Sequence, residues 1–321
     1  MSSDLVLELR NVSKAFATHR AVDNVSLAVK RGELHALLGP SGCGKTTTLR
    51  MVAGFETPTQ GEILLSGQDI AQLKPYERNV STVFQSYALF PHLTVRENIE
   101  FGLRQKGISD RKPKIDQALD LVQLTHRGDH KPPQMSGGEK QRAALARSLV
   151  LEPEVLLLDE PLSALDPNLR KQVRAELKAL QRRVGTTFLM VTHDQEEALS
   201  MSDRITLMNK GRVEQIGTPE EIYLKPRTAF TAGFLGAMNW VDGVGVRPEC
   251  TFVAEERPGN GEHWRSAVVK HSTFLGDCLQ VEAEIPGGAS LVAQVSRLNG
   301  RYHPGQPVHV WWHAHDELRL E

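Results

Sequence analysis

The chain has 321 residues, a formal charge of −1, 40% hydrophobic residues and 24% charged residues. This length predicts about two domains, and the composition excludes a collagen-like, low-complexity or wholly disordered protein. A nearly neutral chain offers no bulk basic field, so we expect no nucleic-acid partner. Three distant cysteines, Cys43, Cys250 and Cys278, form no disulfide framework and indicate a reducing compartment. No apolar run approaches the length of a membrane span.

Short apolar strands alternate with longer helical patterns through the first two thirds of the chain. This alternation predicts an α/β domain with a mostly parallel sheet covered by helices. We expect buried strands at 34–38, 155–158 and 187–191, and a closing hairpin over 205–216. Residues 86–150 interrupt the alternation and predict a helical subdomain inserted between two strands of the sheet.

One helix is predicted with particular clarity, over about 168–184. Asp166 supplies a capping carboxylate, Pro167 a favourable first helical residue, and Gly185 a stop signal. Its apolar stripe repeats at spacings of three and four residues: Leu169, Val173, Leu177, Leu180 and Val184.

The pattern changes after about residue 235, where all four tryptophans of the chain are found. Short strand-like runs at 267–270, 278–283, 290–295 and 308–313 alternate with Gly and Pro turns, which is typical of a small all-β barrel or sandwich. The predicted domains are therefore 1–235 and 236–321.

A glycine-rich segment follows the strand at 34–38 and precedes a helical pattern. Residues 39–46 match G-x-x-x-x-G-K-[ST], in which backbone N–H groups and a helix N-terminus surround phosphate oxygens. Lys45 supplies a positive charge for the β- and γ-phosphates, and the Thr46 hydroxyl is a ligand for Mg²⁺. The alternative, a chance glycine turn, lacks this strand–loop–helix context. The predicted nucleotide-binding residues here are Gly39, Pro40, Ser41, Gly42, Cys43, Gly44, Lys45, Thr46 and Thr47.

Two carboxylates end the buried strand at 155–158. Asp159 is placed to hold the Mg²⁺ shell during phosphoryl transfer. Glu160 leaves the strand in another direction and could polarise an attacking water as a general base. Two acids in a solvated turn are the alternative interpretation, which the neighbouring phosphate loop disfavours.

Residues 135–142 resemble the signature motif of ABC-transporter ATPases, with Met135 for the usual Leu and Glu139 for the usual Gln. Five further motifs stand in that family's order, and the resemblance covers about residues 5–235. They are the phosphate loop at 39–46, Gln85, the Asp159–Glu160 pair, Ser163–Asp166 and Val191–His193.

The resemblance implies roles for further residues. Phe16 would stack on adenine, although an ordinary core phenylalanine is the alternative; Gln85 would touch Mg²⁺ or the lytic water. His193 would contact the γ-phosphate and hold Glu160 in line, and Asp166 would contact the opposite subunit. The implied catalytic set is Glu160, His193, Gln85 and Lys45, and the implied metal set is Thr46, Gln85 and Asp159.

The same resemblance implies a homodimer with ATP between two copies. Ser136, Gly137 and Gly138 of one copy would approach the γ-phosphate bound by the other, because small residues leave the backbone accessible. Residues 86–95, rich in aromatic side chains that we expect to be exposed, resemble the docking surface for a membrane permease. A local hydrophobic cluster is the alternative there.

The last quarter resembles the TOBE-type β-domain of solute importers, with residues 246–249 similar to a recurring motif of that domain. This motif begins only about ten residues after Phe234–Gly236, and such a short gap implies that the first strands of the β-domain are shortened. Exporter ATPases usually lack such a tail, and non-transport ABC ATPases usually carry two cores or a long coiled coil. The resemblance thus implies an importer ATPase at the cytoplasmic membrane face, acting with permease subunits and indirectly with a solute-binding protein.

The cargo is less defined by sequence. Residues 170–217 look most like importers of polyamines such as spermidine and putrescine, while importers of ferric iron, phosphonate, sulfate or sugars read similarly. Near the C-terminus, His309, Trp311, His313 and His315 alternate along an apparent strand. That face is either a polar surface over an apolar core or a zinc site, and we favour the polar surface.

Overall fold

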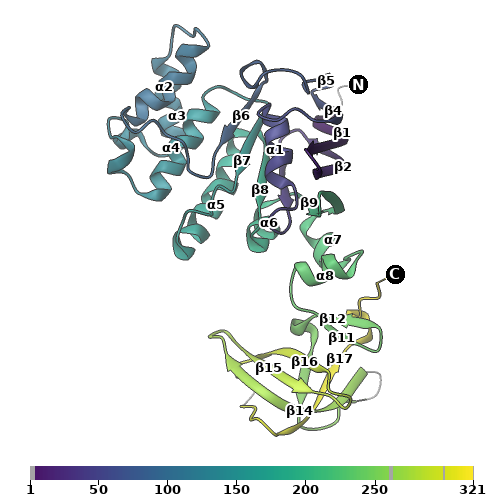
Figure 1. Ribbon diagram of the computed structural model, residues 1–321. Coiled ribbons are helices and arrows are strands. Elements are labelled where there is room, and N and C mark those ends of the chain that lie inside the picture. Colours follow the sequence, from purple (N-terminus) through teal and green to yellow (C-terminus); the bar gives the residue numbers. More distant parts are fainter. Residues whose placement is uncertain (1–3, 260–262, 299–300, 321) are drawn as a thin grey trace. The chain divides into compact units, whose positions relative to one another are not determined.

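The computed structural model describes residues 4–259, 263–298 and 301–320. The chain divides into two compact units, Met1–Glu220 and Glu221–Glu321, which are labelled by element in Figure 1. None of the helices in the described ranges combines the length and apolar character that a membrane crossing requires.

The first unit contains a six-stranded sheet with the order β10-β9-β3-β8-β7-β6. All neighbours are parallel except the hairpin of β9 and β10. The predicted strands and hairpin are confirmed to within a residue or so. The strands are β3 (Leu34–Leu38), β6 (Val80–Val83), β7 (Val155–Asp159), β8 (Thr187–Thr192), β9 (Arg204–Asn209) and β10 (Arg212–Gly217).

A second, antiparallel sheet in this unit has the order β2-β1-β4-β5. The sequence patterns above predicted only the mostly parallel sheet and did not identify this one. Its apolar residues share one core with α1 (Lys45–Ala53) and with the parallel sheet, so α1 lies between the two sheets (Figure 1). The strands are β1 (Leu5–Phe16), β2 (His19–Lys30), β4 (Gln60–Leu65) and β5 (Gln68–Asp69).

Between β6 and β7, where the sequence predicts a helical subdomain, the chain forms a run of helices. These helices cluster beyond the β6 edge of the parallel sheet (Figure 1), and each is joined by short turns. They are α2 (Val95–Gln105), α3 (Lys112–Leu121), η2 (Thr125–Arg127), η3 (Pro132–Gln134) and α4 (Gly137–Leu149).

The helix predicted over 168–184 is confirmed as α5 (Pro167–Val184). The Asp166 side chain accepts the N–H of Leu169 at 3.0 Å, and Gly185 ends the helix at φ +66°. Val173, Leu177 and Leu180 of the predicted stripe are buried. The shorter α6 (Gln195–Met201) follows β8. Local capping and periodicity together therefore fixed this helix.

The second unit is mainly antiparallel β-structure. Its five-stranded sheet has the order β13-β17-β14-β15-β16 and packs with a small β11–β12 hairpin around Trp312. The predicted strands lie inside longer ones, and the predicted boundary at 235/236 lies between α8 and β11. The elements are α7 (Pro219–Leu224), α8 (Ala229–Phe234), β11 (Asn239–Val241), β12 (Val244–Val246), η4 (Pro248–Cys250), β13 (Phe252–Ala254), β14 (His263–Phe274), β15 (Cys278–Glu284), β16 (Ser290–Ser296), β17 (Pro307–Trp312) and η5 (Ala314–Asp316).

The histidine-bearing face near the C-terminus is shorter than the sequence suggested. β17 ends at Trp312, so His313 and His315 lie beyond it, and His315 belongs to the turn η5. Within β17 the expected alternation holds, with Val308 and Val310 buried. Among the described residues, no cluster of three or more His, Cys, Asp or Glu side chains could hold a metal ion.

Candidate active site

The glycine-rich loop between β3 and α1 needs glycine at both of its ends. A Cβ on Gly39 would lie 2.2 Å from the carbonyl oxygen of Met208, and one on Gly44 would lie 2.5 Å from that of Ala21. Both residues also have positive φ, +154° and +101°, which L side chains rarely adopt. The loop therefore packs its own backbone against β2 and β9 and leaves its N–H groups at the start of α1.

Lys45 is held inside this loop. Its Nζ donates to the carbonyl oxygens of Gly39 at 2.7 Å and Pro40 at 2.9 Å, and it lies 3.7 Å from Cys43 Sγ. The ammonium group therefore stands at the loop where the phosphates are expected. Burial raises the pKa of the Cys43 thiol despite the nearby lysine, which keeps it protonated at neutral pH.

β7 ends in the two carboxylates that the sequence singled out. Burial raises the pKa of Asp159, and the adjacent Glu160 raises it further. An acid in this position gains from a bound cation, because the cation offsets the cost of burying its charge. Glu160 has φ +47°, a conformation that costs about 1–3 kcal/mol in a non-glycine residue and is often found at active sites. Its N–H is anchored on Val191 O at 3.0 Å.

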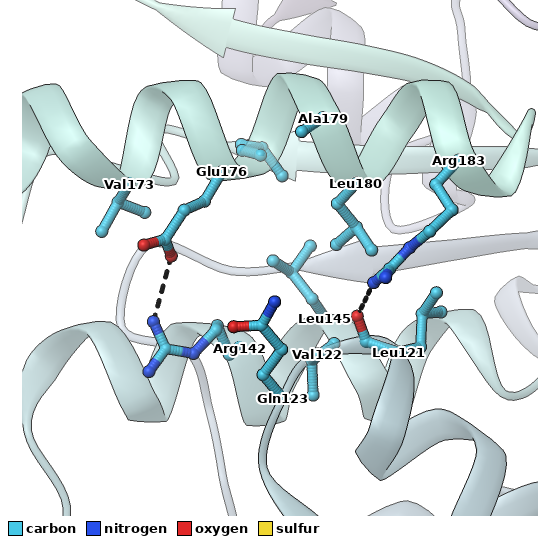
Figure 2. Close-up of a pocket in the computed structure, with 11 residues that line it drawn as sticks. Leu121, Val122, Gln123, Arg142, Leu145, Val173, Glu176, Ala179, Leu180 and Arg183 are labelled. Atoms are coloured by element: carbon cyan, nitrogen blue, oxygen red, sulfur yellow. Dashed lines mark hydrogen bonds and ion pairs between the residues drawn. The ribbon is translucent and has the colours of Figure 1, made fainter.

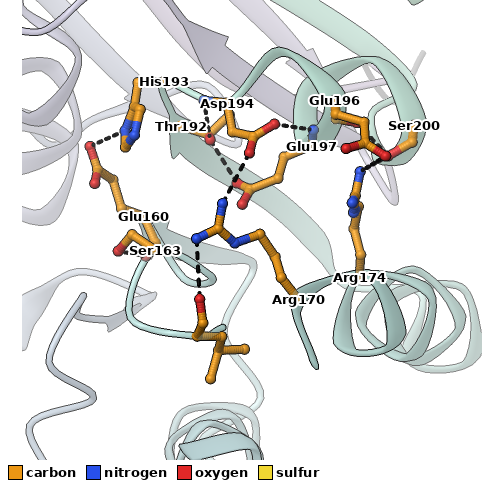
Figure 3. A network of polar contacts seen from close by, with 11 residues as sticks. Glu160, Ser163, Arg170, Arg174, Thr192, His193, Asp194, Glu196, Glu197 and Ser200 are labelled. Atoms are coloured by element: carbon orange, nitrogen blue, oxygen red, sulfur yellow. Dashed lines mark hydrogen bonds and ion pairs between the residues drawn. The ribbon is translucent and has the colours of Figure 1, made fainter. Parts of the chain in front are cut away.

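Three segments distant in sequence meet at the Glu160 carboxylate. Gln85, just after β6, places its Nε2 3.3 Å from Glu160 Oε2 and 3.0 Å from Ser163 Oγ. His193, just after β8, places its Nδ1 3.1 Å from Glu160 Oε1. Figure 3 shows the histidine turned toward Glu160. The carboxyl ends of β6, β7 and β8 therefore bring together Gln85, Glu160 and His193, as expected for a parallel sheet.

A network of polar side chains surrounds the residues next to His193 in the chain (Figure 3). The Thr192 hydroxyl donates to Glu197 Oε2 at 2.6 Å, and Asp194 caps α6 by accepting the N–H of Glu197. Arg170 of α5 donates to Asp194 Oδ2 at 3.3 Å and to the carbonyl oxygen of Leu165 at 3.1 Å. The residues on both sides of His193 are thus fixed, and Arg170 ties them to the loop that contains Asp166.

The signature segment forms the start of α4. Ser136 is the N-cap: its Oγ accepts the Glu139 N–H at 3.3 Å, while Glu139 Oε2 accepts the Ser136 N–H at 2.8 Å. Arg127 donates from Nε to Glu139 Oε1 at 2.9 Å. These hydrogen bonds, with the one from Arg127 to Glu139, lower the pKa of Glu139. Among the described residues, no hydrogen bond links this segment to Gln85, Glu160 or His193.

Two further positions are clear in the structure. The Phe16 ring is 42% exposed at the end of β1 and does not belong to the core, and Lys14 Nζ lies 4.8 Å from its centroid. Asp166 serves as the N-cap of α5, where its Oδ1 accepts the Leu169 N–H.

A cavity of about 750 Å³ opens between β6, α2 and α4. Phe84, Phe90 and Phe101 contribute aromatic surface to its lining. The expectation that the aromatics of 86–95 are exposed is wrong for Tyr87, which is buried. Arg147 of α4 fixes this segment by donating to Tyr87 O at 3.0 Å and Ala88 O at 2.6 Å.

A smaller cavity of about 220 Å³ separates α4 from α5 and is lined mainly by apolar side chains (Figure 2). Arg142 bridges it by donating to Glu176 Oε2 at 3.1 Å, and Arg183 reaches the Leu121 carbonyl. These contacts hold the helical insertion, and with it the signature segment, on the long helix α5.

The sequence patterns above missed several of these positioning residues. The capping boxes Thr94–Glu97 and Ser136–Glu139 were visible as the spacing S/T-x-x-E and could have been predicted. Arg127, Arg147 and Arg170 act on groups distant in sequence, and no local spacing identifies such partners.

Comparison with known proteins identifies the family. Residues 22–163 match the ABC transporter family and residues 244–320 match the TOBE domain. The chain is 45% identical to the spermidine/putrescine import ATP-binding protein PotA of Bacillus cereus, over 98% of this chain and 99% of that protein. It is 49% identical to the protein of the same name from Thermobifida fusca, over 92% of this chain and 78% of that protein.

Solved structures agree with this assignment. A dimeric ATP-binding cassette in a post-hydrolysis state, bound to ADP and Pi, aligns with a TM-score of 0.59 at 33% identity, covering 66% of this chain and 98% of that chain. A nucleotide-free ATP-binding cassette from an ABC transporter aligns with a TM-score of 0.60 at 26% identity, covering 68% of this chain and 92% of that one. From its sequence, its fold and these relatives, the chain belongs to the ATP-hydrolysing, ATP-binding subunits of ABC transporters and carries a C-terminal TOBE domain.

Proposed function

We propose that this chain works as a homodimer at the cytoplasmic face of a membrane, where it hydrolyses ATP to drive the import of spermidine and putrescine. The observation that carries the hydrolytic part is the convergence of Gln85, Glu160 and His193 at the carboxyl ends of β6, β7 and β8. The phosphate loop follows β3, which pairs with β8 in the same sheet.

The roles of the residues follow from their chemistry. Glu160 takes a proton from water as the water oxygen bonds to the γ-phosphorus, and the bond from that phosphorus to the β-phosphate oxygen breaks to release ADP. His193 orients Glu160 and donates to the γ-phosphate. Lys45 and the N–H groups of 39–47 stabilise charge on the phosphates. Phe16 offers an exposed ring for the adenine.

The residues expected to hold Mg²⁺ fit a hard cation. Thr46, Gln85 and Asp159 offer only oxygen ligands, which Mg²⁺ prefers. Burial raises the pKa of Asp159, and a cation beside it would lower that pKa and favour the ionised form. When bound, Mg²⁺ would neutralise charge on the β- and γ-phosphates.

Dimerisation is supported by the placement of the signature. Ser136, Gly137 and Gly138 stand at the N-terminus of α4, in the helical insertion, and no hydrogen bond among the described residues joins them to the Glu160 group. A partner copy can bring them to the nucleotide, with Asp166 at the contact. The similar cassette that binds ADP and Pi is itself dimeric.

The partner in the membrane is a permease, and the cavity between β6, α2 and α4 is the surface on which we expect it to dock. Its aromatic lining suits an apolar helix, and Arg147 connects it through the backbone of 87–88 to the segment that carries Gln85. A solute-binding protein would act on the opposite side of the permease and would not touch this chain.

The polyamine cargo rests on the printed names of two relatives at 45% and 49% identity. The ATPase subunit does not touch the cargo, so no residue described above distinguishes polyamines from ferric iron, phosphonate, sulfate or sugars. Uptake measurements decide among them.

The test combines hydrolysis with uptake. In cells that lack the native copy, the wild-type chain should restore uptake of labelled spermidine and putrescine. Glu160→Gln should reduce ATP hydrolysis and uptake by at least about 100-fold, because it removes the general base. ATP binding should persist in this variant.

Glu152→Gln is the matched control, since this carboxylate is a surface group paired with Lys114. It should leave both activities unchanged. Hydrolysis that survives in Glu160→Gln would overturn the assignment of the base. Normal hydrolysis with no polyamine uptake would overturn the cargo and leave the ATPase assignment intact.

A further inference from the structure

The signature segment of this chain carries an acid that has its own arginine. Glu139 is only 14% exposed, and Arg127 Nε lies 2.9 Å from its Oε1. The guanidinium is oriented from its other side, because Arg127 Nη1 lies 3.1 Å from His130 Nε2. Arg127 comes from η2, twelve residues earlier in the chain. An acid and a base from separate turns are therefore joined beside the N-cap of α4.

The helix cap alone does not require this arginine. α2 begins with the same capping box, in which Thr94 Oγ1 accepts the Glu97 N–H at 3.1 Å and Glu97 Oε2 accepts the Thr94 N–H at 2.7 Å. Among the described residues, no arginine or lysine lies within ion-pair distance of Glu97; the Thr94 N–H mainly lowers its pKa, and Lys131 and His92 add smaller effects from farther away. The two boxes have the same local geometry, so the arginine at Glu139 serves something other than helix capping.

What distinguishes the second box is the neighbour we propose for it. If Ser136 and Gly138 approach the γ-phosphate bound by a partner copy, Glu139 lies one helical turn from a group with several negative charges. A carboxylate there repels the nucleotide, and the repulsion acts across the dimer interface, where water is partly excluded. A glutamine could close the same box without this repulsion.

We propose that Arg127 is a positioning residue for ATP-dependent dimerisation: it pairs with Glu139 and offsets the negative charge of that carboxylate beside the nucleotide of the partner subunit. This inference rests on the proposed function, because it requires the signature of one copy to face ATP bound by another. Arg127 does not touch the nucleotide and acts only through Glu139.

The experiment is a charge cycle in the full-length chain assembled with its permease. Arg127→Gln should raise the ATP concentration for half-maximal hydrolysis by about 3- to 10-fold, because the acid becomes uncompensated. Glu139→Gln should need the same ATP concentration for half-maximal hydrolysis as the wild type, or a lower one. The double variant Arg127→Gln/Glu139→Gln should return to the wild-type value.

Arg111→Gln is the matched control. Arg111 Nε lies 2.8 Å from Glu100 Oε1, and the pair lies in the same helical insertion. Loss of this ion pair should not change the ATP concentration for half-maximal hydrolysis. Thermal unfolding of all variants separates a folding defect from a defect in ATP-dependent association.

Each result has a distinct meaning. A wild-type chain without ATP hydrolysis or ATP-dependent dimerisation would overturn the proposed function itself. An active wild type with an unaffected Arg127→Gln variant would overturn only the role of Arg127. A defect that Glu139→Gln fails to rescue would do the same, because the effect would not then arise from the acid.

Discussion

Two regions of the molecule differ in backbone conformation and in the burial of polar groups. One is the carboxyl edge of the parallel sheet, and the other is the five-stranded sheet of the second unit. At the parallel sheet, Glu160 adopts a positive φ, Asp159 is an acid with a raised pKa, and Gly39 and Gly44 tolerate no Cβ. In the second unit, the core around Trp312 is apolar and β17 alternates regularly, although β14 has a register shift after Val269 and Asp242 has φ +49°. At the edge of the parallel sheet, residues with an expected chemical role break local rules, whereas β17 obeys its alternation in a region where stability is the main requirement.

The largest effect on stability should come from a substitution in the core of the second unit. Trp312 is 1% exposed, and its Nε1 donates to Glu317 Oε1 at 3.1 Å. Trp312→Ala should destabilise the second unit by about 3–5 kcal/mol, because it leaves a cavity and an unpaired partner. Tryptophan fluorescence during denaturation measures this unit alone, since all four tryptophans lie within it.

Trp240→Ala is the control. Trp240 is 44% exposed, so its substitution should lower the free energy of unfolding far less than Trp312→Ala does. Nucleotide binding should persist in Trp312→Ala. If ATP affinity fell together with the stability of the second unit, the two regions would be coupled and the contrast between them would be lost.

The next largest effect should come from a substitution in the phosphate loop at 39–46. Gly44→Ala should weaken ATP binding by at least about 100-fold, or roughly 2.7 kcal/mol, because the added Cβ would lie 2.5 Å from Ala21 O and displace the loop. Titration with a fluorescent ATP analogue measures the affinity.

Gly243→Ala shows what an alanine at a positive φ does to stability outside the phosphate loop, because Gly243 belongs to the second unit. Gly243 has φ +82° but open space around the added Cβ. It should lower stability modestly and leave ATP affinity unchanged. Equal ATP affinities in the two variants would contradict the steric argument.

The smallest effect is a pH-dependent one at Asp159. Its pKa is raised in the folded chain, so the folded state holds a proton more tightly than the unfolded state does. Stability from this group is therefore lost as pH rises from the unfolded value of 3.8 through the raised folded value. Asp159→Asn should raise the melting temperature of the nucleotide-free protein at pH 7 and abolish hydrolysis.

Asp116→Asn should act in the opposite direction, because Arg96 and Lys112 lower the pKa of Asp116. Its stabilising effect is present above the unfolded pKa and disappears as pH falls through the folded one. Melting curves between pH 4 and 8 measure both variants. A lower melting temperature for Asp159→Asn at pH 7 would contradict the burial argument.

The sequence by itself determined the features that depend on neighbours along the chain. Residues 39–46, the strands of the parallel sheet and the capped helix α5 follow from glycine placement, apolar runs and capping residues, because these signals act over a few positions. The change in composition near residue 235 predicts two domains, whereas the two compact units divide at 220/221, because most of α7 and all of α8 belong to the second unit. The signature and the catalytic candidates were found as short motifs.

Only the tertiary structure decided which distant groups meet. The antiparallel sheet of β1, β2, β4 and β5 pairs strands across a helix and a phosphate loop, and the hydrogen bond from Arg170 to Asp194 joins α5 to the residue that caps α6. Tyr87 is buried and Glu139 is paired with Arg127 because the helical insertion folds back on itself. Such contacts arise from packing between elements, whose geometry no local spacing encodes.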